Sequence, residues 1–296
     1  MRRRRFSLGV GGSLAAAAFG ATARSAGKDD ALQRLEAASG GRLGVFMLDT
    51  GTGRSRDYRA DERFPMCSTF KFLAAAFMLQ RADDGLEELM RAVPVPPKAE
   101  LVPYSPVTGP SAGTTMAMAQ LCEAAVTVSD NTAANLMLAS FGGPAGLTGF
   151  ARALGDRFTR LDRNEPTLND ATPGDDRDTT TPSAMVGLMK KLLVDRTLET
   201  SSRNQLQAWL VANTTGGRQL RAGLPSGWRV GDKTGAGANG TGNDIAIVWP
   251  PGVGAAPLLV AAFLTGSTTT SVEQRQATLA AVGALVPTFA GIAGKG

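Results

Sequence analysis

A serine and a lysine three residues apart could supply a nucleophile and a group that accepts its proton. Residues 67–71 read CSTFK and open an apolar stretch that is predicted to be helical from Phe70 to Leu79. Residues three apart share one face of a helix, so Ser68 would lie one turn from Lys71. The free N–H groups at a helix start favour negative charge on the serine oxygen. A serine before an apolar helix is also a common N-cap, so this pattern alone does not establish catalysis.

Two further tripeptides could take part in the same chemistry. Ser129-Asp130-Asn131 follows a helical pattern at 121–128, and Lys233-Thr234-Gly235 closes a predicted strand before the glycine-rich residues 236–242. A lysine and a hydroxyl beside glycine would suit the binding of a carboxylate. Each tripeptide also has a structural interpretation. The first could be a turn and helix cap, and the second an edge-strand lysine that opposes aggregation.

The composition restricts the chemistry that these residues could perform. The 296 residues include no histidine, which excludes Ser-His-Asp and Cys-His systems and the usual zinc hydrolase sites. Cys67 and Cys122 are the two cysteines, too few for a metal site made of cysteine alone. Hydrolysis would therefore depend on Ser, Lys, Tyr, Asp or Glu, and no metal or organic cofactor is expected.

The N-terminus has the pattern of an export signal. Arg2 to Arg5 precede an apolar stretch at 8–19 that is too short to span a bilayer, and residues 21–23 read ATA, a cleavage pattern. The arginines fit a twin-arginine signal over residues 1–23, which predicts export to the periplasm or medium. The alternative is a basic tail that binds nucleic acid or anionic lipid.

Cleavage would also remove most of the positive charge. Residues 1–23 contain four arginines and no acidic residue, so the net charge would fall from +5 to +1. The mature protein is therefore not expected to bind nucleic acid or to insert into a membrane.

Strand patterns at both ends of the chain enclose a helical middle. A short helix is predicted at 29–39, strands at 43–47 and 54–59, and further strands at 228–233, 244–249 and 258–265. Ser271 and Gln274 form a capping-box pattern for a last helix that reaches about Ala290. We expect an α/β (α+β) fold, with an antiparallel sheet built from both terminal segments and flanked by helices.

The predicted domains follow from this layout. Residues 28–65 and 222–296 would form a discontinuous α/β domain, and residues 66–221 an inserted all-helical domain. The cleft between the two is the expected active site.

Together, S-x-x-K, S-D-N and K-T-G in this order resemble the signature of class A β-lactamases and penicillin-binding proteins. Residues 163–178, which begin Arg163-Asn164-Glu165-Pro166, resemble the Ω-loop of the class A enzymes. In that family a glutamate on the loop activates water to hydrolyse the acyl-enzyme, and penicillin-binding transpeptidases lack it. Arg163 and Asp178 match the pair that clamps the loop, although they could be an ordinary surface pair. Glu165-Pro166 is a candidate cis bond.

The resemblance assigns catalytic roles to four residues. Ser68 would attack the lactam carbonyl, and Ser129 would protonate the departing ring nitrogen. Glu165 would activate the deacylating water. Whether Lys71 or Glu165 takes the serine proton during acylation is left open.

The resemblance also implies a set of substrate-binding residues. Asn131 would hold Lys71 and the substrate amide, Asn169 would help to position water, and Tyr104 would line the entrance. The N–H groups of Ser68 and Ala236 would form an oxyanion hole. The predicted receptor for the substrate carboxylate comprises Lys233, Thr234, Gly235 and Arg221. For Arg221 the alternative is an ordinary exposed arginine.

The expected activity is that of a monomeric serine β-lactamase. Its small-molecule substrate would be a β-lactam antibiotic, and the enzyme would confer resistance to it.

Cys67 and Cys122 are predicted to be free, buried thiols, because relatives that pair a cysteine at either position have a partner cysteine that this chain lacks. Two alternatives remain: a penicillin-binding DD-peptidase, and a non-hydrolytic β-lactam sensor that is acylated once.

Overall fold

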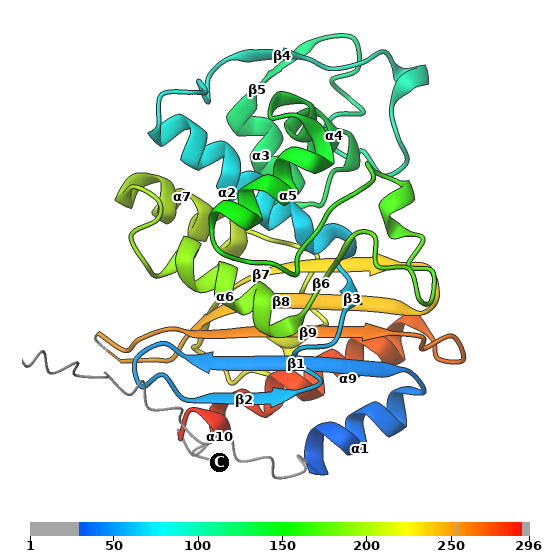
Figure 1. Ribbon diagram of the computed structural model, residues 1–296, viewed down its shortest axis with the longest axis vertical. Coiled ribbons are helices and arrows are strands. Elements are labelled where there is room, and N and C mark those ends of the chain that lie inside the picture. The colour runs from blue at the N-terminus through cyan, green and yellow to red at the C-terminus, as the bar shows by residue number, and fades with distance from the viewer. Residues whose placement is uncertain (1–29, 253, 292–296) are drawn as a thin grey trace, which may run out of the picture.

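The computed structural model describes residues 30–252 and 254–291 (Figure 1). The predicted signal at 1–23 therefore lies outside the described residues. Among those described, no helix combines the length and apolar character needed to cross a membrane.

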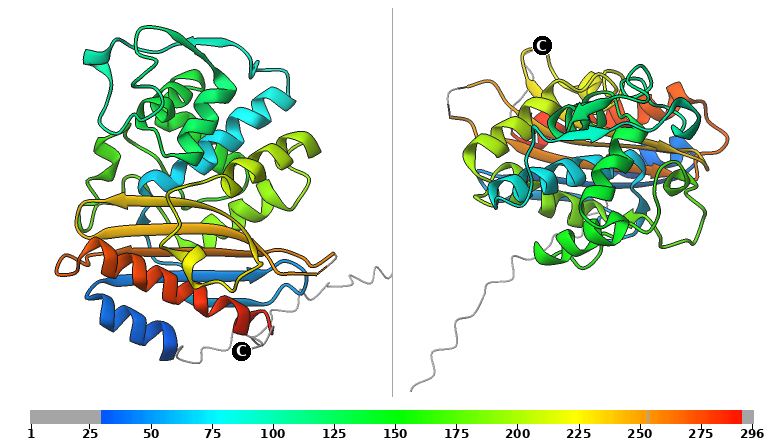
Figure 2. Two further views of the ribbon diagram at one scale, coloured as in Figure 1. Left: turned by 180° about the vertical axis from the view of Figure 1, so that it is seen from behind. Right: turned by 90° about the horizontal axis from the view of Figure 1, so that it is seen from above.

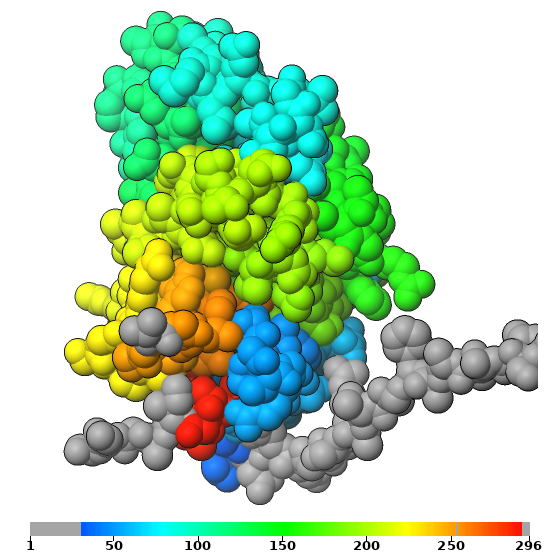
Figure 3. All heavy atoms as spheres, turned by 90° about the vertical axis from the view of Figure 1, so that its left-hand side faces the viewer, coloured from blue at the N-terminus to red at the C-terminus, as the bar shows by residue number. Residues whose placement is uncertain are grey.

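A five-stranded antiparallel sheet combines the two ends of the chain, in the order β2-β1-β9-β8-β7. Strands β1 (Arg42–Asp49) and β2 (Ser55–Tyr58) come from the N-terminal part. Strands β7 (Arg229–Gly237), β8 (Thr241–Trp249) and β9 (Leu258–Thr265) come from the C-terminal part. The pairing of β1 with β9 joins the two parts, which confirms the predicted fold class. Figure 3 shows the blue N-terminal segment packed beside the yellow-to-orange C-terminal one.

Side chains alternate between two hydrophobic clusters on opposite faces of the sheet. In β8, Ile245 and Ile247 belong to one cluster, whereas Ala246 and Val248 belong to the other. This period of two is the geometry of a strand buried on both faces. Helices α1 (Asp30–Ser39) and α9 (Val272–Ala284) cover the second face, as the view from behind shows (Figure 2).

The middle of the chain forms the helical part above the opposite face. At its centre is α2 (Phe70–Asp83), whose residues are buried on all sides over most of its length, as expected for a central helix that is apolar all round. The surrounding helices are α3 (Met118–Thr127), α4 (Asn131–Ser140), α5 (Gly143–Ala153), α6 (Pro182–Leu193) and α7 (Thr200–Val211). The short helix α8 (Leu220–Gly223) lies instead against α9 on the second face of the sheet.

Short elements connect these layers. They are the paired strands β3 (Phe64–Pro65) with β6 (Thr179–Thr180) and β4 (Ala92–Pro94) with β5 (Thr115–Ala117), and the 3₁₀ turns Cys67–Thr69, Lys98–Glu100 and Thr167–Asn169.

Two predicted boundaries were wrong. The K-T-G motif does not close its strand, because β7 continues to Gly237 and pairs there with Thr241 in a tight hairpin. The last helix is not continuous to Ala290. It begins at the predicted Ser271–Gln274 capping box, ends at Ala284 and is followed by α10 (Val286–Phe289). Pro287 lacks the N–H that a continuous helix would need at that position.

Candidate active site

The 3₁₀ turn Cys67–Thr69 holds Ser68 at the start of α2, facing a cleft. Cys67 adopts the left-handed φ of 44°, a conformation that costs energy for a residue with a side chain. The Ser68 hydroxyl donates to Glu165 Oε1 across 3.3 Å. The serine hydroxyl therefore points to the Glu165 carboxylate, and no hydrogen bond from it to Lys71 is present among the described residues.

Lys71 is an ammonium surrounded by oxygen atoms. Its Nζ lies 2.6 Å from Asn131 Oδ1, 2.9 Å from the Ser129 carbonyl oxygen and 2.9 Å from Glu165 Oε1. All three partners are acceptors, and together with the Ser129 hydroxyl oxygen at 3.3 Å they share the three protons of a charged lysine. Burial lowers the pKa of Lys71, while the charge of Glu165 acts to raise it.

Ser129 lies between two buried lysines. Its Oγ is 3.3 Å from Lys71 Nζ and 3.1 Å from Lys233 Nζ. Because both ammonium groups donate to this oxygen, the proton of the Ser129 hydroxyl is free to point into the cleft. Burial, and then the charge of Lys71, lower the pKa of Lys233 to about 7.

The S-D-N tripeptide is both a helix cap and part of the site. Asp130 is the N-cap of α4, and its carboxylate accepts the Ala133 N–H at 2.9 Å. This cap lets Ser129 and Asn131, on either side of it, face the cleft. Ser129 itself has a left-handed φ of 62°. The structural and functional interpretations of the motif therefore hold together.

Glu165 is held from both sides of its peptide unit. The Asn135 side chain on α4 accepts the Glu165 N–H and donates to the Glu165 carbonyl, each at 2.9 Å. The Glu165-Pro166 bond is cis, as predicted. Asn169 Nδ2 donates to Glu165 Oε2 at 2.5 Å. The carboxylate is 3% exposed, so its orientation is fixed by these contacts.

Arg163 and Asp178 join the two ends of the loop at 163–178. Arg163 Nε donates to Asp178 Oδ2 at 2.6 Å, and Asp178 Oδ1 accepts the N–H groups of Asp162 and Arg163. The carboxylate of Asp178 is buried, which distinguishes this contact from an exposed surface pair. A second contact, from Arg163 Nη1 to Asp170 Oδ2 at 2.7 Å, ties the arginine to the middle of the loop.

A cleft of about 390 Å³ opens above Ser68. Eight of the predicted site residues line it: Ser68, Tyr104, Ser129, Asn131, Asn169, Thr234, Gly235 and Ala236. Three further lining residues were not predicted: Thr215, Gln219 and Gln276. Thr215 Oγ1 lies 2.5 Å from Thr234 Oγ1. In the sequence, Thr215 and Gln219 are separated from β7 by a loop with no recognisable pattern, and only the fold brings them to this strand.

Two glycines let β7 approach the nucleophile turn. A Cβ on Gly235 would lie 2.7 Å from the Met66 carbonyl oxygen, and one on Gly237 would lie 2.7 Å from both Cys67 Sγ and the Asn169 carbonyl oxygen. No side chain fits at these distances, so glycine permits the strand to form one wall of the cleft.

Arg221 does not line the cleft. Its Nη2 donates to Asp232 Oδ1 at 2.5 Å, and the Asp232 side chain is fully buried. The guanidinium is therefore paired with a buried carboxylate, which argues against the predicted contact with a substrate carboxylate. Asp244 lies in the same region, and burial and the Asp232 charge raise its pKa well above the usual value.

Both cysteines are free and buried, as predicted. Burial raises the pKa of each thiol, so neither is a reactive thiolate at neutral pH. Among the described residues, no group of three or more His, Cys, Asp or Glu side chains could hold a metal ion.

Comparison with known proteins agrees with this geometry. A model of the β-lactamase enzyme family matches residues 28–289. Beta-lactamase AST-1 of Nocardia asteroides is 51% identical over 243 residues, which are 82% of this chain and 77% of the relative. Beta-lactamase CTX-M-8 of Citrobacter amalonaticus is 47% identical over 255 residues, 86% of each chain.

A solved ancestral class A β-lactamase, GNCA, superposes with a TM-score of 0.85 at 57% identity, over 87% of this chain and 98% of that one. The chain therefore belongs to the β-lactamase enzyme family, in its class A branch.

Proposed function

We propose that the protein hydrolyses β-lactam antibiotics through an acyl-enzyme on Ser68, and so confers resistance to them. The observation that carries this proposal is the position of one carboxylate oxygen. Glu165 Oε1 lies 3.3 Å from Ser68 Oγ and 2.9 Å from Lys71 Nζ. A single base can therefore serve the bond-forming step at the serine and the later attack of water on its ester.

In acylation, Ser68 Oγ forms a bond to the lactam carbonyl carbon and loses its proton. Glu165 Oε1 is the acceptor that the hydroxyl already contacts. Lys71, satisfied by three oxygen acceptors, acts as a fixed positive charge that stabilises the ionised carboxylate. The N–H groups of Ser68 and Ala236 would stabilise the oxyanion, since both residues line the cleft.

Breaking the lactam C–N bond requires a proton on the departing nitrogen. Ser129 supplies it, because its oxygen accepts from Lys71 and Lys233 and its own hydrogen is free for the cleft. The ammonium groups then stabilise the negative charge that develops on the Ser129 oxygen.

Deacylation uses the second oxygen and its neighbour. Asn169 Nδ2 holds Glu165 Oε2, while Asn169 Oδ1 has no partner among the described residues and can accept a hydrogen bond from the attacking water. Before this step the proton that Glu165 took from Ser68 passes through Lys71, which contacts both Glu165 Oε1 and Ser129 Oγ, and restores the Ser129 hydroxyl. Glu165 then removes a proton from the water as its oxygen bonds to the ester carbon. The same proton passes to Ser68 Oγ as the ester bond breaks.

The remaining cleft residues bind the substrate. Thr234 receives the substrate carboxylate, and the Thr215 hydroxyl beside it extends this polar wall. Lys233 does not line the cleft but lies buried behind Ser129, and its positive charge attracts the carboxylate from there. Asn131 holds Lys71 and offers its side chain to the substrate amide. Tyr104, 61% exposed, stands at the entrance.

The experiment that tests this function is a paired time course with a chromogenic cephalosporin, followed by absorbance and intact mass. The wild-type protein should turn over steadily. Glu165→Gln should lose turnover by about 100-fold or more and accumulate a covalent adduct on Ser68. The matched control is Glu123→Gln on the exposed side of α3, which should behave as the wild type does.

A stoichiometric adduct without turnover in the wild-type protein would instead support the DD-peptidase or the sensor. Glu165 argues against both, since each needs an acyl-enzyme that is protected from water. Its carboxylate contacts the serine and can activate water there, which exposes the acyl-enzyme to hydrolysis.

We also propose that the chain is exported by the twin-arginine route to the periplasm or medium, and that it acts as a monomer with the two domains expected from the sequence. A cleft complete within one chain supports the monomer.

Replacing Arg4 and Arg5 with lysine should leave the precursor inside the cell. Light scattering of the mature protein should give the mass of one chain. Export of the double variant would contradict the route, and the mass of two chains would contradict the monomer.

A further inference from the structure

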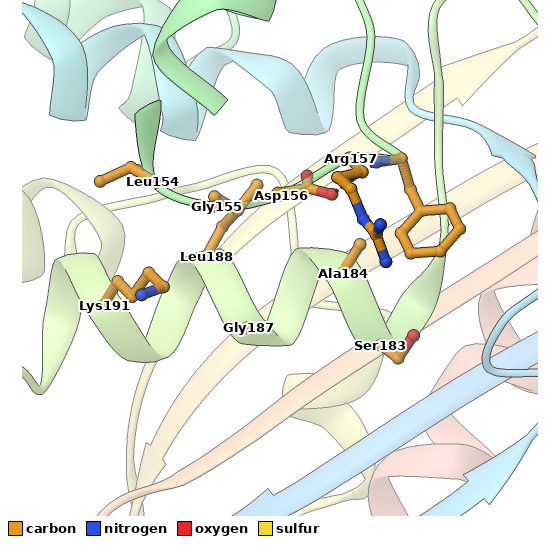
Figure 4. Close-up of a pocket in the computed structure, with 10 residues that line it drawn as sticks. Leu154, Gly155, Asp156, Arg157, Ser183, Ala184, Gly187, Leu188 and Lys191 are labelled. Atoms are coloured by element: carbon orange, nitrogen blue, oxygen red, sulfur yellow. Dashed lines mark hydrogen bonds between the residues drawn. The ribbon is translucent and has the colours of Figure 1, made fainter. Parts of the chain in front are cut away.

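A second cavity, of about 300 Å³, lies between α6 and the segment that follows α5 (Figure 4). It shares no lining residue with the catalytic cleft. One wall is segment 154–158, and the other is the exposed face of α6 from Ser183 to Lys191. The proposed catalytic mechanism uses none of these residues.

The cavity exists because α6 carries no side chain at its middle. Gly187 is exposed, and a Cβ at this position would meet no atom within 4 Å. Glycine in a helix interior is less favourable than alanine, and here no close contact requires it. Leu154, Ala184 and Leu188 supply apolar surface around the space that Gly187 leaves open.

The charge around this cavity is positive and unpaired. Arg157 and Lys191 line it, and neither makes a hydrogen bond or ion pair within the described part of the chain. In Figure 4, the Arg157 guanidinium extends over α6 near Ala184, and Lys191 lies at the other end of the cavity. The carboxylate in the lining, Asp156, already accepts the N–H groups of Phe158 and Thr159.

We propose that this cavity binds a small organic anion: an aromatic or short alkyl body that carries one carboxylate or sulfonate. The apolar surface beside Gly187 would hold the body, and Phe158, 43% exposed, would cover it at the rim. Arg157 or Lys191 would pair with the acidic group. The site does not depend on the proposed hydrolytic function.

Two dyes that differ in one group provide the test. Anilinonaphthalene sulfonate has the predicted chemistry, and N-phenylnaphthylamine is the same ring system without the sulfonate. Fluorescence titration of the mature protein should show saturable binding of the anion at one site, with weaker binding of the neutral dye. Amide resonances of 154–158 and 183–191 should shift, and those of the cleft residues should not.

Variants with matched controls locate the site. Gly187→Leu fills the cavity and should weaken binding by at least about tenfold. Gly149→Leu, at an exposed glycine inside α5 with equally open space, should not change it. Arg157→Gln with Lys191→Gln should weaken binding about three- to tenfold. Arg34→Gln with Lys98→Gln, a matched removal of two exposed charges elsewhere, should have no effect. Retained cephalosporin hydrolysis would show that each variant is folded.

Equal binding of the dye by Gly187→Leu and the wild type would overturn the proposal. So would shifts confined to the catalytic cleft, or equal affinity for the charged and neutral dyes. A lipid could offer the same chemistry as a free anion. Sedimentation with phosphatidylglycerol vesicles distinguishes the two. If the wild-type protein sediments with the vesicles but does not bind the free dye, and Gly187→Leu does not sediment, the cavity binds a membrane and the small-molecule site is overturned.

Discussion

Two lysines with fully buried side chains meet at one serine hydroxyl, and their mutual repulsion makes the site sensitive to pH. Lys233 is the group that titrates near neutrality, because burial and the Lys71 charge lower its pKa to about 7. Only the protonated form attracts a substrate carboxylate. The attraction is fully present only well below pH 7, is halved near the lowered pKa and is lost as the pH rises further.

We therefore predict that KM for a penicillin with a free carboxylate rises above pH 7, by up to about tenfold for each pH unit. A methyl ester of the same penicillin should show no such rise, since it carries no negative charge for Lys233 to bind. Steady-state kinetics of the two substrates between pH 6 and about 9 will measure this. A rise of equal size with the ester would exclude Lys233 as its cause.

The cysteines give a second prediction at the residue scale. Cys67 and Cys122 are free, and burial raises the pKa of both thiols. Ellman's reagent should find no reactive thiol in the native protein and two in denatured protein that has not been reduced. Finding none after denaturation would mean that the two are oxidised.

At the scale of elements, α4 positions the loop that carries Glu165. Asn135 on this helix makes both hydrogen bonds to the Glu165 peptide unit. Asn135→Ala should release the loop from α4 and misplace the Glu165 carboxylate. Because a misplaced base slows the reaction more than the loss of one binding contact does, deacylation should slow by about 100-fold and the acyl-enzyme should accumulate. Rapid-quench mass spectrometry will show the adduct. Ser140→Ala, on the same helix but away from Glu165, is the control, and an equal adduct there would refute the role of Asn135.

A second element-scale prediction concerns the ion pair between α8 and β7. Arg221→Gln leaves the buried Asp232 carboxylate without its cation, next to Asp244. We expect a loss of about 2–3 kcal/mol in the free energy of unfolding, measured by urea denaturation. The KM ratio of the free penicillin to its ester should stay unchanged. A selective loss of binding for the free acid would instead restore Arg221 to the substrate site.

These elements show what the sequence could and could not predict. Motifs with fixed spacing placed Ser68 and Ser129 because each lies within a few residues of the helix that positions it. Asn135, Thr215 and Gln219 carry no local signal, and only tertiary packing brings them to Glu165 and β7. The role of Arg221 stays a prediction, because the sequence identifies a cation but not the buried Asp232 with which it pairs.

At the scale of the whole molecule, the sheet separates two hydrophobic clusters that support different parts of the structure. The first fills the helical side below the cleft, and the second lies between the sheet and α1 and α9. Strand patterns at both ends of the chain, with helical patterns between them, predicted a sheet made from both terminal segments. They could not predict that Gln276 on α9 reaches the cleft while no residue of the second cluster lines it, because that depends on tertiary packing.

This separation predicts that stability can be lost without loss of catalysis. Leu279 on α9 is 1% exposed within the second cluster. Leu279→Ala should lower the free energy of unfolding by about 3 kcal/mol through lost burial and the cavity that remains. Well below the midpoint of thermal unfolding, kcat/KM should equal that of the wild type. Val272→Ala, at an exposed position of the same helix, should change stability by less than about 0.5 kcal/mol. If kcat/KM fell together with stability in Leu279→Ala, the two faces of the sheet would be coupled, and the second cluster would have to be counted among the supports of the active site.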